Sequence, residues 1–211
     1  MVSALICSGQ LSLPVWEAYV PSRAQKAQSV ERRWQRFLCN GLINVNKLYI
    51  PLVMLALSEW KSARLYLALD TTMLWNQYCM IHLSVVCCGR AVPFLWLALE
   101  HKSAMVAFET YRPVLRRARW LLREHPDVMV LADRGFANHQ LMSWLQNSRW
   151  HYCLRIPCDV VLHRPCRCPT EVRRLWPCKG EAVLYRNVGL WDDGIYRCNL
   201  VLANIKGVKE P

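Results

Sequence analysis

The chain has 211 residues, of which 54% are hydrophobic and 20% charged, and it carries a formal net charge of +12. This composition excludes wholesale disorder, because so many apolar side chains are enough to bury a core. The positive charge predicts a polyanionic partner, either nucleic acid or an anionic membrane surface. The 11 cysteines are an odd number and too dilute for a disulfide-stapled secreted domain, so we expect free thiols in a reducing compartment.

The first 62 residues are expected to form an N-terminal helical segment. Ser29 is a suitable cap for a helix that stops at Asn40-Gly41, and a second helix is expected from Pro51 to Trp60. The start of the chain has no signal-peptide pattern, because polar residues at 8–10 interrupt its apolar stretch.

Three strands are expected next. Residues 65–69 form a short, continuous apolar run that is typical of a strand buried on both faces, and the run stops at Asp70. Residues 78–99 are apolar enough to suggest a membrane span, but Gly89-Arg90 lies in the middle of the run, where a span tolerates charge least. Two strands joined by a tight Gly-Arg turn fit better, which predicts an antiparallel meander and no membrane partner.

A helix with a basic face is expected over residues 103–124. Pro113 indicates either the start of this helix or a kink within it. Apolar residues recur at core spacing, and four arginines share another face: Arg112, Arg116, Arg119 and Arg123. This row either follows a DNA backbone or forms a solvated helix face.

A second buried strand, residues 128–132, stops at Asp133. Asn138 is expected to cap a helix that runs to Gln146, and a further strand is expected over residues 150–156. The inward face of this helix is predicted to carry Leu141, Trp144 and Leu145.

The order β-β-β-α-β-α-β is that of an RNase H-like core, so we expect an α/β fold with a mixed sheet over residues 63–157. Residues 158–211 are rich in Pro and Cys, with strands expected at 181–188 and 195–205. This composition and these expected strands predict a β-rich insertion segment.

The candidate chemistry lies in the two acids that follow apolar strands. If the strands are neighbours, Asp70 and Asp133 converge at one edge of the sheet. Paired carboxylates without His or Cys suit a hard ion such as Mg²⁺ or Mn²⁺, and two such ions assist in-line displacement at a phosphodiester. The alternative interpretation is that each Asp merely begins a turn after a strand.

Around these acids the sequence resembles the bacterial DDE transposases of the insertion-sequence 4-like type. The segments that carry the resemblance are Leu67-Ala68-Leu69-Asp70-Thr71-Thr72 and Val130-Leu131-Ala132-Asp133-Arg134-Gly135-Phe136. The resemblance spans about residues 32–202. It implies an RNase H-like core with Asp70 and Asp133 as catalytic metal ligands. It also implies double-stranded DNA, both transposon ends and target, as the partner, a cytoplasmic, nucleoid-associated location in a bacterium, and a β-rich insertion. Dimerisation stays open.

The third acidic motif of that family, Tyr-x2-Arg-x3-Glu-x6-Lys on a helix, has no match. Tyr152 and Arg155 have the first spacing, with Asp159 at the acid position, but Cys166 replaces the Lys. Pro157 and the strand pattern also oppose a helix there. We therefore expect a truncated, inactive transposase fragment, or alternatively a non-catalytic DNA-binding remnant.

Two weaker patterns remain. Residues 158–178 contain Cys158, His163, Cys166, Cys168 and Cys178, but no Cys-x2-Cys pair, so reduced thiols are expected rather than a zinc site. Arg134, next to the second acid, either reaches a phosphate or pairs with a neighbouring carboxylate.

Overall fold

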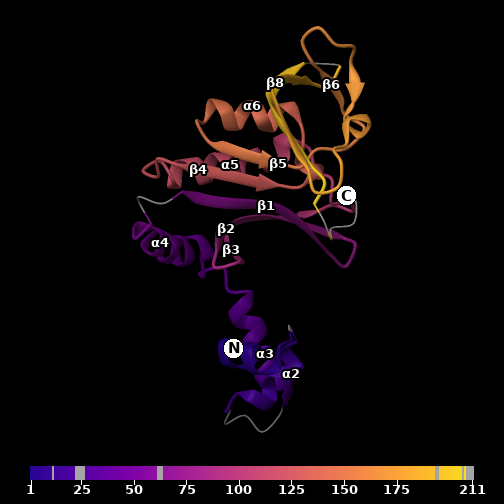
Figure 1. Cartoon of the computed structure of the whole chain (residues 1–211). Helices are drawn as coiled ribbons and strands as arrows, with labels where there is room; N and C mark the ends of the chain where they lie inside the picture. Colours follow the sequence, from indigo (N-terminus) through magenta and orange to yellow (C-terminus); the bar gives the residue numbers. More distant parts are fainter. Residues whose placement is uncertain (11, 22–26, 61–63, 193–194, 206, 208–211) are drawn as a thin grey trace. The chain divides into compact units, whose positions relative to one another are not determined.

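The computed structural model describes the chain except for residues 11, 22–26, 61–63, 193–194, 206 and 208–211 (Figure 1). The contacts within it divide the chain into two units, Met1–Leu52 and Val53–Pro211. The expected boundaries at residues 62/63 and 157/158 stay predictions.

The first unit is helical. Its elements, with the helix that crosses into the second unit, are α1 (Val2–Ser8), α2 (Leu13–Trp16), the 3-10 helix η1 (Glu17–Tyr19), α3 (Ala27–Leu38) and α4 (Val45–Ser58). Trp16 and Trp34 meet edge to face in a small core, with ring centroids 5.8 Å apart.

Both helix starts predicted for this region were wrong. The first helix, α3, begins at Ala27, so Ser29 lies inside it, because the buried residues Val30 and Trp34 determine its register. The second, α4, begins at Val45, where the Asn44 side chain accepts the backbone N–H of Lys47 at 3.1 Å. Pro51 is consequently an interior residue of α4 rather than its first turn.

The second unit contains a five-stranded mixed sheet in the order β3-β2-β1-β4-β5. Its strands are β1 (Leu65–Leu74), β2 (Tyr78–Cys87), β3 (Arg90–Glu100), β4 (Val128–Ala132) and β5 (His151–Leu154). The first three pair antiparallel, which confirms the meander, whereas β4 pairs parallel with both β1 and β5. The tight turn between β2 and β3 consists of Cys88 and Gly89, one residue earlier than predicted, with φ values of 49° and 71° that suit a type I′ hairpin.

The first strand is longer than its apolar run. Pairing with β2 continues from Leu67↔Val85 to Leu74↔Tyr78, so β1 extends five residues beyond Leu69. The prediction that the strand ends at Asp70 was therefore wrong: Asp70 lies inside β1, opposite His82 of β2. The cross-strand ladder, rather than hydrophobicity, determines how far the strand runs.

Two helices connect the parallel strands. These are α5 (Phe108–Leu121) and α6 (His139–Asn147), which contact β3 and β5 respectively. Pro113 lies inside α5. The predicted cap of α6 is confirmed, because the Asn138 side chain accepts the N–H of Leu141 at 2.8 Å. The prediction that Trp144 faces inward was wrong, since its side chain is only half-buried while its neighbours Leu141 and Leu145 are fully buried.

The short 3-10 helix η2 (Arg134–Phe136) is tied to α5. Phe136 packs edge to face on Tyr111, and the Asn138 amide donates to the Tyr111 hydroxyl at 3.3 Å. Burial raises the pKa of Tyr111, and the Asn138 contact partly offsets this rise. The loop that follows β4 is thus fixed against the buried face of α5.

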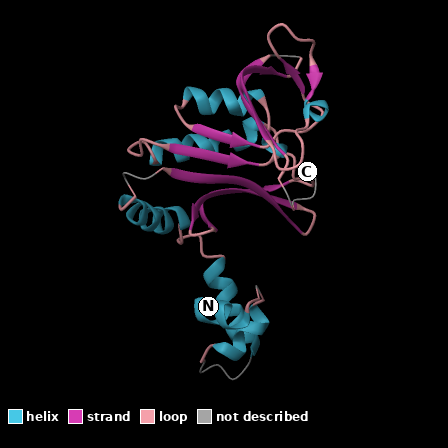
Figure 2. Cartoon of the chain, viewed as in Figure 1, coloured by secondary structure: helices cyan, strands magenta, loops and turns pink. Residues whose placement is uncertain are grey.

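A second, four-stranded sheet lies after residue 158 (Figure 2). Its strand order is β7-β6-β8-β9. Its elements are β6 (Val161–His163), β7 (Thr170–Glu171), the 3-10 helix η3 (Val172–Leu175), β8 (Ala182–Leu190) and β9 (Tyr196–Ala203). Met142 of α6 belongs to its hydrophobic core, and Tyr152 and Leu154 of β5 pack against that core. The two sheets are therefore joined through α6 and β5.

Within the residues that the structure describes, no helix is both long enough and apolar enough to cross a membrane. All 11 cysteines carry free thiols.

Two tyrosine hydroxyls and a glutamine amide are linked by hydrogen bonds where the two sheets meet, and these bonds provide a test of stability. The Tyr196 hydroxyl donates to the Gln146 amide oxygen at 2.8 Å and lies 3.1 Å from the Tyr152 hydroxyl. Burial raises the pKa of Tyr152. We expect Tyr196→Phe to lower the free energy of unfolding by about 1–3 kcal/mol, because it leaves a half-buried hydroxyl with one partner fewer. Urea unfolding measures this change.

Tyr185→Phe is the matched control, because in the described structure that hydroxyl makes no hydrogen bond while its ring lies near the Arg164 guanidinium. Equal losses in the two variants would show that the hydroxyl chain contributes nothing at the junction.

Candidate functional site

The two acids lie on neighbouring parallel strands. The ladder between β1 and β4 ends with the pair Leu69↔Ala132. Asp70 is the next residue within β1, and Asp133 directly follows the end of β4. Both side chains are exposed. The sequence predicts that the two carboxylates converge if their strands are neighbours, and β1 and β4 are neighbours.

Each carboxylate has one oxygen engaged by its own chain. One oxygen of Asp70 accepts the N–H of Thr71 at 2.8 Å, and one oxygen of Asp133 accepts the N–H of Gly135 at 3.0 Å. Within the described residues, the second oxygen of each carboxylate makes no hydrogen bond. Two exposed, hard oxygen donors oriented by backbone N–H groups suit Mg²⁺ or Mn²⁺.

Gly135 lies close to the Asp133 carboxylate. A Cβ at this position would lie 3.2 Å from the Asp133 oxygen that its N–H binds. A larger residue would force the carboxylate to shift by a few tenths of an ångström. The glycine of the Asp-Arg-Gly-Phe segment thus supports the orientation of Asp133.

One neighbour of the pair was missed by sequence reasoning. His82 lies directly across from Asp70, and its Nε2 is 3.1 Å from the Thr72 hydroxyl. Only the hairpin register reveals this, because the residues are 12 positions apart in the chain. The other ring nitrogen, Nδ1, lies 3.5 Å from the Ser84 hydroxyl, so the imidazole is engaged along its own sheet face.

Neither a third acid nor a zinc site is assembled in the described part of the chain. No group of three His, Cys, Asp or Glu side chains there could hold a metal ion. Tyr152 lies in β5, where the extended backbone is incompatible with the helix that a third acidic motif needs. In the Cys-rich segment, His163 instead pairs with Asp192 at 2.9 Å.

Arg134 follows Asp133 in η2 and is exposed. Its guanidinium forms no ion pair or hydrogen bond with any residue that the structure describes, whereas its backbone carbonyl accepts the N–H of Ala137 at 3.2 Å. The predicted pairing with a neighbouring carboxylate is therefore not formed, and contact with a phosphate stays a prediction.

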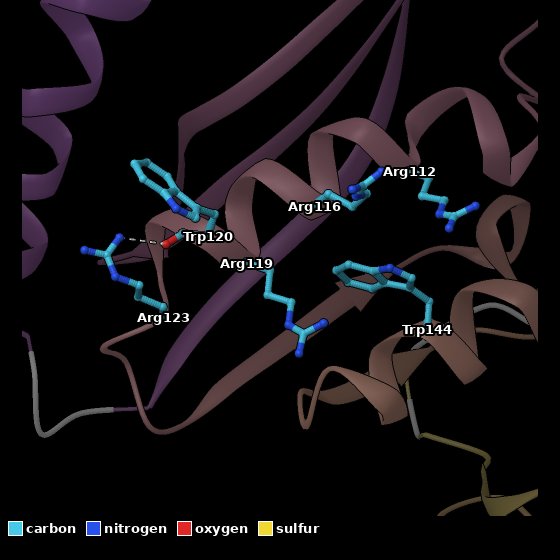
Figure 3. Close-up of a pocket in the computed structure, with 6 residues that line it drawn as sticks. All are labelled: Arg112, Arg116, Arg119, Trp120, Arg123 and Trp144. Carbon is cyan, nitrogen blue, oxygen red and sulfur yellow. Dashed lines mark hydrogen bonds between the residues drawn. The ribbon is translucent and has the colours of Figure 1, made fainter.

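The arginine row of α5 lines a groove of about 520 Å³ (Figure 3). Its lining residues are Arg112, Arg116, Arg119, Trp120, Arg123 and Trp144. Five of the six come from the exposed side of α5 and the turn after it, and Trp144 reaches the groove from α6. Sequence reasoning found the arginines from their helical spacing and missed Trp144, because a Trp between two buried leucines reads as core.

The chain matches no family model and none of the curated proteins.

The carboxylate pair predicts a measurable response to metal. Asp70→Asn and Asp133→Asn each keep an oxygen that can accept the same backbone N–H, so we expect the metal-free melting temperature to stay equal or to rise as mutual repulsion is relieved. Mn²⁺ should raise the melting temperature of the parent but not that of the variants. At a Mn²⁺ concentration of a hundred times its Kd, binding adds about 2.7 kcal/mol to the free energy of unfolding of the parent. Thermal melts with and without Mn²⁺ measure both effects.

Asp159→Asn, at an exposed acid outside this pair, is the control and should keep the full response to Mn²⁺. Turn-forming acids without a metal role would instead give destabilised variants and a parent that does not respond to Mn²⁺.

Proposed function

We propose that the chain is a fragment of a DDE-type transposase of the insertion-sequence 4-like family, with an RNase H-like core that acts on double-stranded DNA. The observation that carries the proposal is the register of β1 with β4. It puts Asp70 and Asp133 one residue beyond the same paired position, Leu69↔Ala132.

The topology supports the proposed core. From β1 to β5 the elements follow the chain order β-β-β-α-β-α-β that is expected of an RNase H-like core, in a mixed sheet in which β2 alone is antiparallel to its neighbours. The second sheet follows β5 in the chain, where the family resemblance implies a β-rich insertion.

In this proposal the residues of the chain position the DNA and the ion. The free oxygens of Asp70 and Asp133 would hold Mg²⁺ or Mn²⁺, while their other oxygens stay on the backbone N–H groups of Thr71 and Gly135. Held there, the ion supplies Lewis-acid activation of water or a 3′-hydroxyl and stabilises the leaving oxygen. The Arg134 guanidinium, which has no partner in the described structure, is available to contact a phosphate next to the scissile bond.

The wider setting follows from the same resemblance. Transposon ends and target DNA are the proposed partners, and the proposed location is the bacterial nucleoid. The +12 charge supports a polyanionic partner. Dimerisation is left open.

A second candidate is a non-catalytic DNA-binding remnant. It is favoured by a specific observation: the described residues bring together a groove of arginines but no third metal ligand beside the acid pair. Under this candidate the chain keeps its affinity for DNA without the chemistry.

We expect the 211-residue chain neither to nick nor to join DNA. Two carboxylates hold one ion loosely, and a displacement of about 1 Å at a reacting centre can cost about a hundredfold in rate. Supercoiled-plasmid nicking with Mg²⁺ or Mn²⁺ measures this, beside the Asp70→Asn/Asp133→Asn double variant as a control for contaminating nuclease.

Nicking by the parent that disappears in the double variant would contradict the expected inactivity and would reveal a third ligand. Nicking that persists in both would identify a contaminant.

A further inference from the structure

The groove on α5 has an uneven charge distribution. Arg112 at one end pairs with Glu109 at 2.7 Å, and Arg123 at the other end lies 3.7 Å from Glu124. The guanidinium groups of the two central arginines, Arg116 and Arg119, form no ion pair or hydrogen bond with the described residues. Both are exposed. The unbalanced positive charge is therefore concentrated in the middle of the row.

The Nε atom of Arg112 adds a further unsatisfied donor. This atom is buried, yet it has no hydrogen-bond partner in the described structure, although the same guanidinium pairs with Glu109 through Nη1. A buried donor without a partner is costly, and the guanidinium that carries it lines the groove.

Trp144 lines the groove together with the arginines and adds an aromatic surface to it (Figure 3). Trp150, which is buried, packs nearly perpendicular to it, with centroids 5.8 Å apart and an interplanar angle of 85°. The indole is thus held in place while part of its surface stays exposed. Its N–H has no partner among the described residues. Trp120, by contrast, is already engaged by the Arg123 guanidinium, 5.1 Å from its ring centroid.

We infer that this groove binds single-stranded nucleic acid, with phosphates on Arg116 and Arg119 and an unpaired base stacked on Trp144. A row of guanidiniums alone would suit the backbone of a duplex equally well. An indole beside them favours a strand with unpaired bases, because the bases of a duplex are stacked on each other and present no free face.

The dimensions are consistent with a short stretch of strand. The row runs from Arg112 in α5 to Arg123, two residues beyond the end of the helix at Leu121. These 11 residue steps correspond to about 16 Å at the helical rise of 1.5 Å per residue. A groove of about 520 Å³ is large enough to hold part of a strand. Only the choice of DNA as the polymer rests on the proposed function; the acid pair takes no part in this site.

The test is the anisotropy of a labelled oligothymidylate, compared with a duplex of the same length, over a range of salt concentrations. We expect the single strand to bind more tightly than the duplex. Arg116→Ala/Arg119→Ala should lower the slope of log K against log salt by about 1.4, because each lost phosphate contact on a single strand accounts for about 0.7. Arg117→Ala/Lys102→Ala, which removes two charges that do not line the groove, is the matched control and should leave the slope nearly unchanged.

Trp144→Leu keeps an apolar side chain against Trp150 but removes the stacking surface. We expect it to weaken single-strand binding by roughly 5- to 150-fold and duplex binding hardly at all. Thermal melts of every variant show whether it is folded. A Trp144→Phe variant, which retains a ring, should recover part of the affinity.

Three results would overturn the inference: equal or tighter binding of the duplex, no effect of Trp144→Leu in a folded variant, or displacement of the strand by polyglutamate at matched charge, which would indicate an acidic protein partner.

The Asp70→Asn/Asp133→Asn variant should bind the strand as the parent does. Loss of Mn²⁺ response with intact strand binding would therefore refute the proposed function alone, and the reverse result would refute only this inference.

Discussion

The parallel pairing of β1 with β4 is the constraint on which the rest of the structure depends. A strand cannot be joined to a parallel neighbour by a tight turn. After β3 the chain therefore runs through the crossover helix α5 before β4 pairs with β1. Arg64 and Asp127 hold the start of the pair, with the guanidinium Nε 2.8 Å from the carboxylate and the N–H of Leu65 donating to the Asp127 carbonyl at 2.9 Å. The register set at this end carries Asp70 and Asp133 to equivalent positions at the other.

The crossover also explains why arginine is concentrated on α5. One face of this helix is buried, with Tyr111, Leu115 and Ala118 fully excluded from solvent, and the face with the arginine row is left outside. Five arginines and two glutamates lie within residues 108–124, so the outer surface is strongly positive. The acid pair and the arginine groove thus arise from one topological unit, β1 to β4 with its connecting helix.

The second sheet limits the freedom of α6. Met142 is buried in the core of that sheet, and Gln146 accepts a hydrogen bond from Tyr196 of β9. On the other side of the helix, Leu141 and Leu145 are fully buried. Held in this way, α6 presents Trp144 at a defined place beside the arginines. A β-rich segment far along the chain therefore helps to shape a groove to which it contributes no lining residue.

The sequence by itself determined the elements whose signals are local. It predicted the strand at 128–132, the Asn138 cap, the helical arginine row and the two acids, because apolar runs, caps and helical spacing depend on adjacent residues. Only the tertiary structure decided the extent of β1, the position of His82 opposite Asp70, and the exposure of Trp144. Each of these depends on a partner distant in the chain: a ladder lengthens a strand beyond its apolar run, a hairpin register selects cross-strand neighbours, and the direction a helix faces decides whether an indole is core or surface.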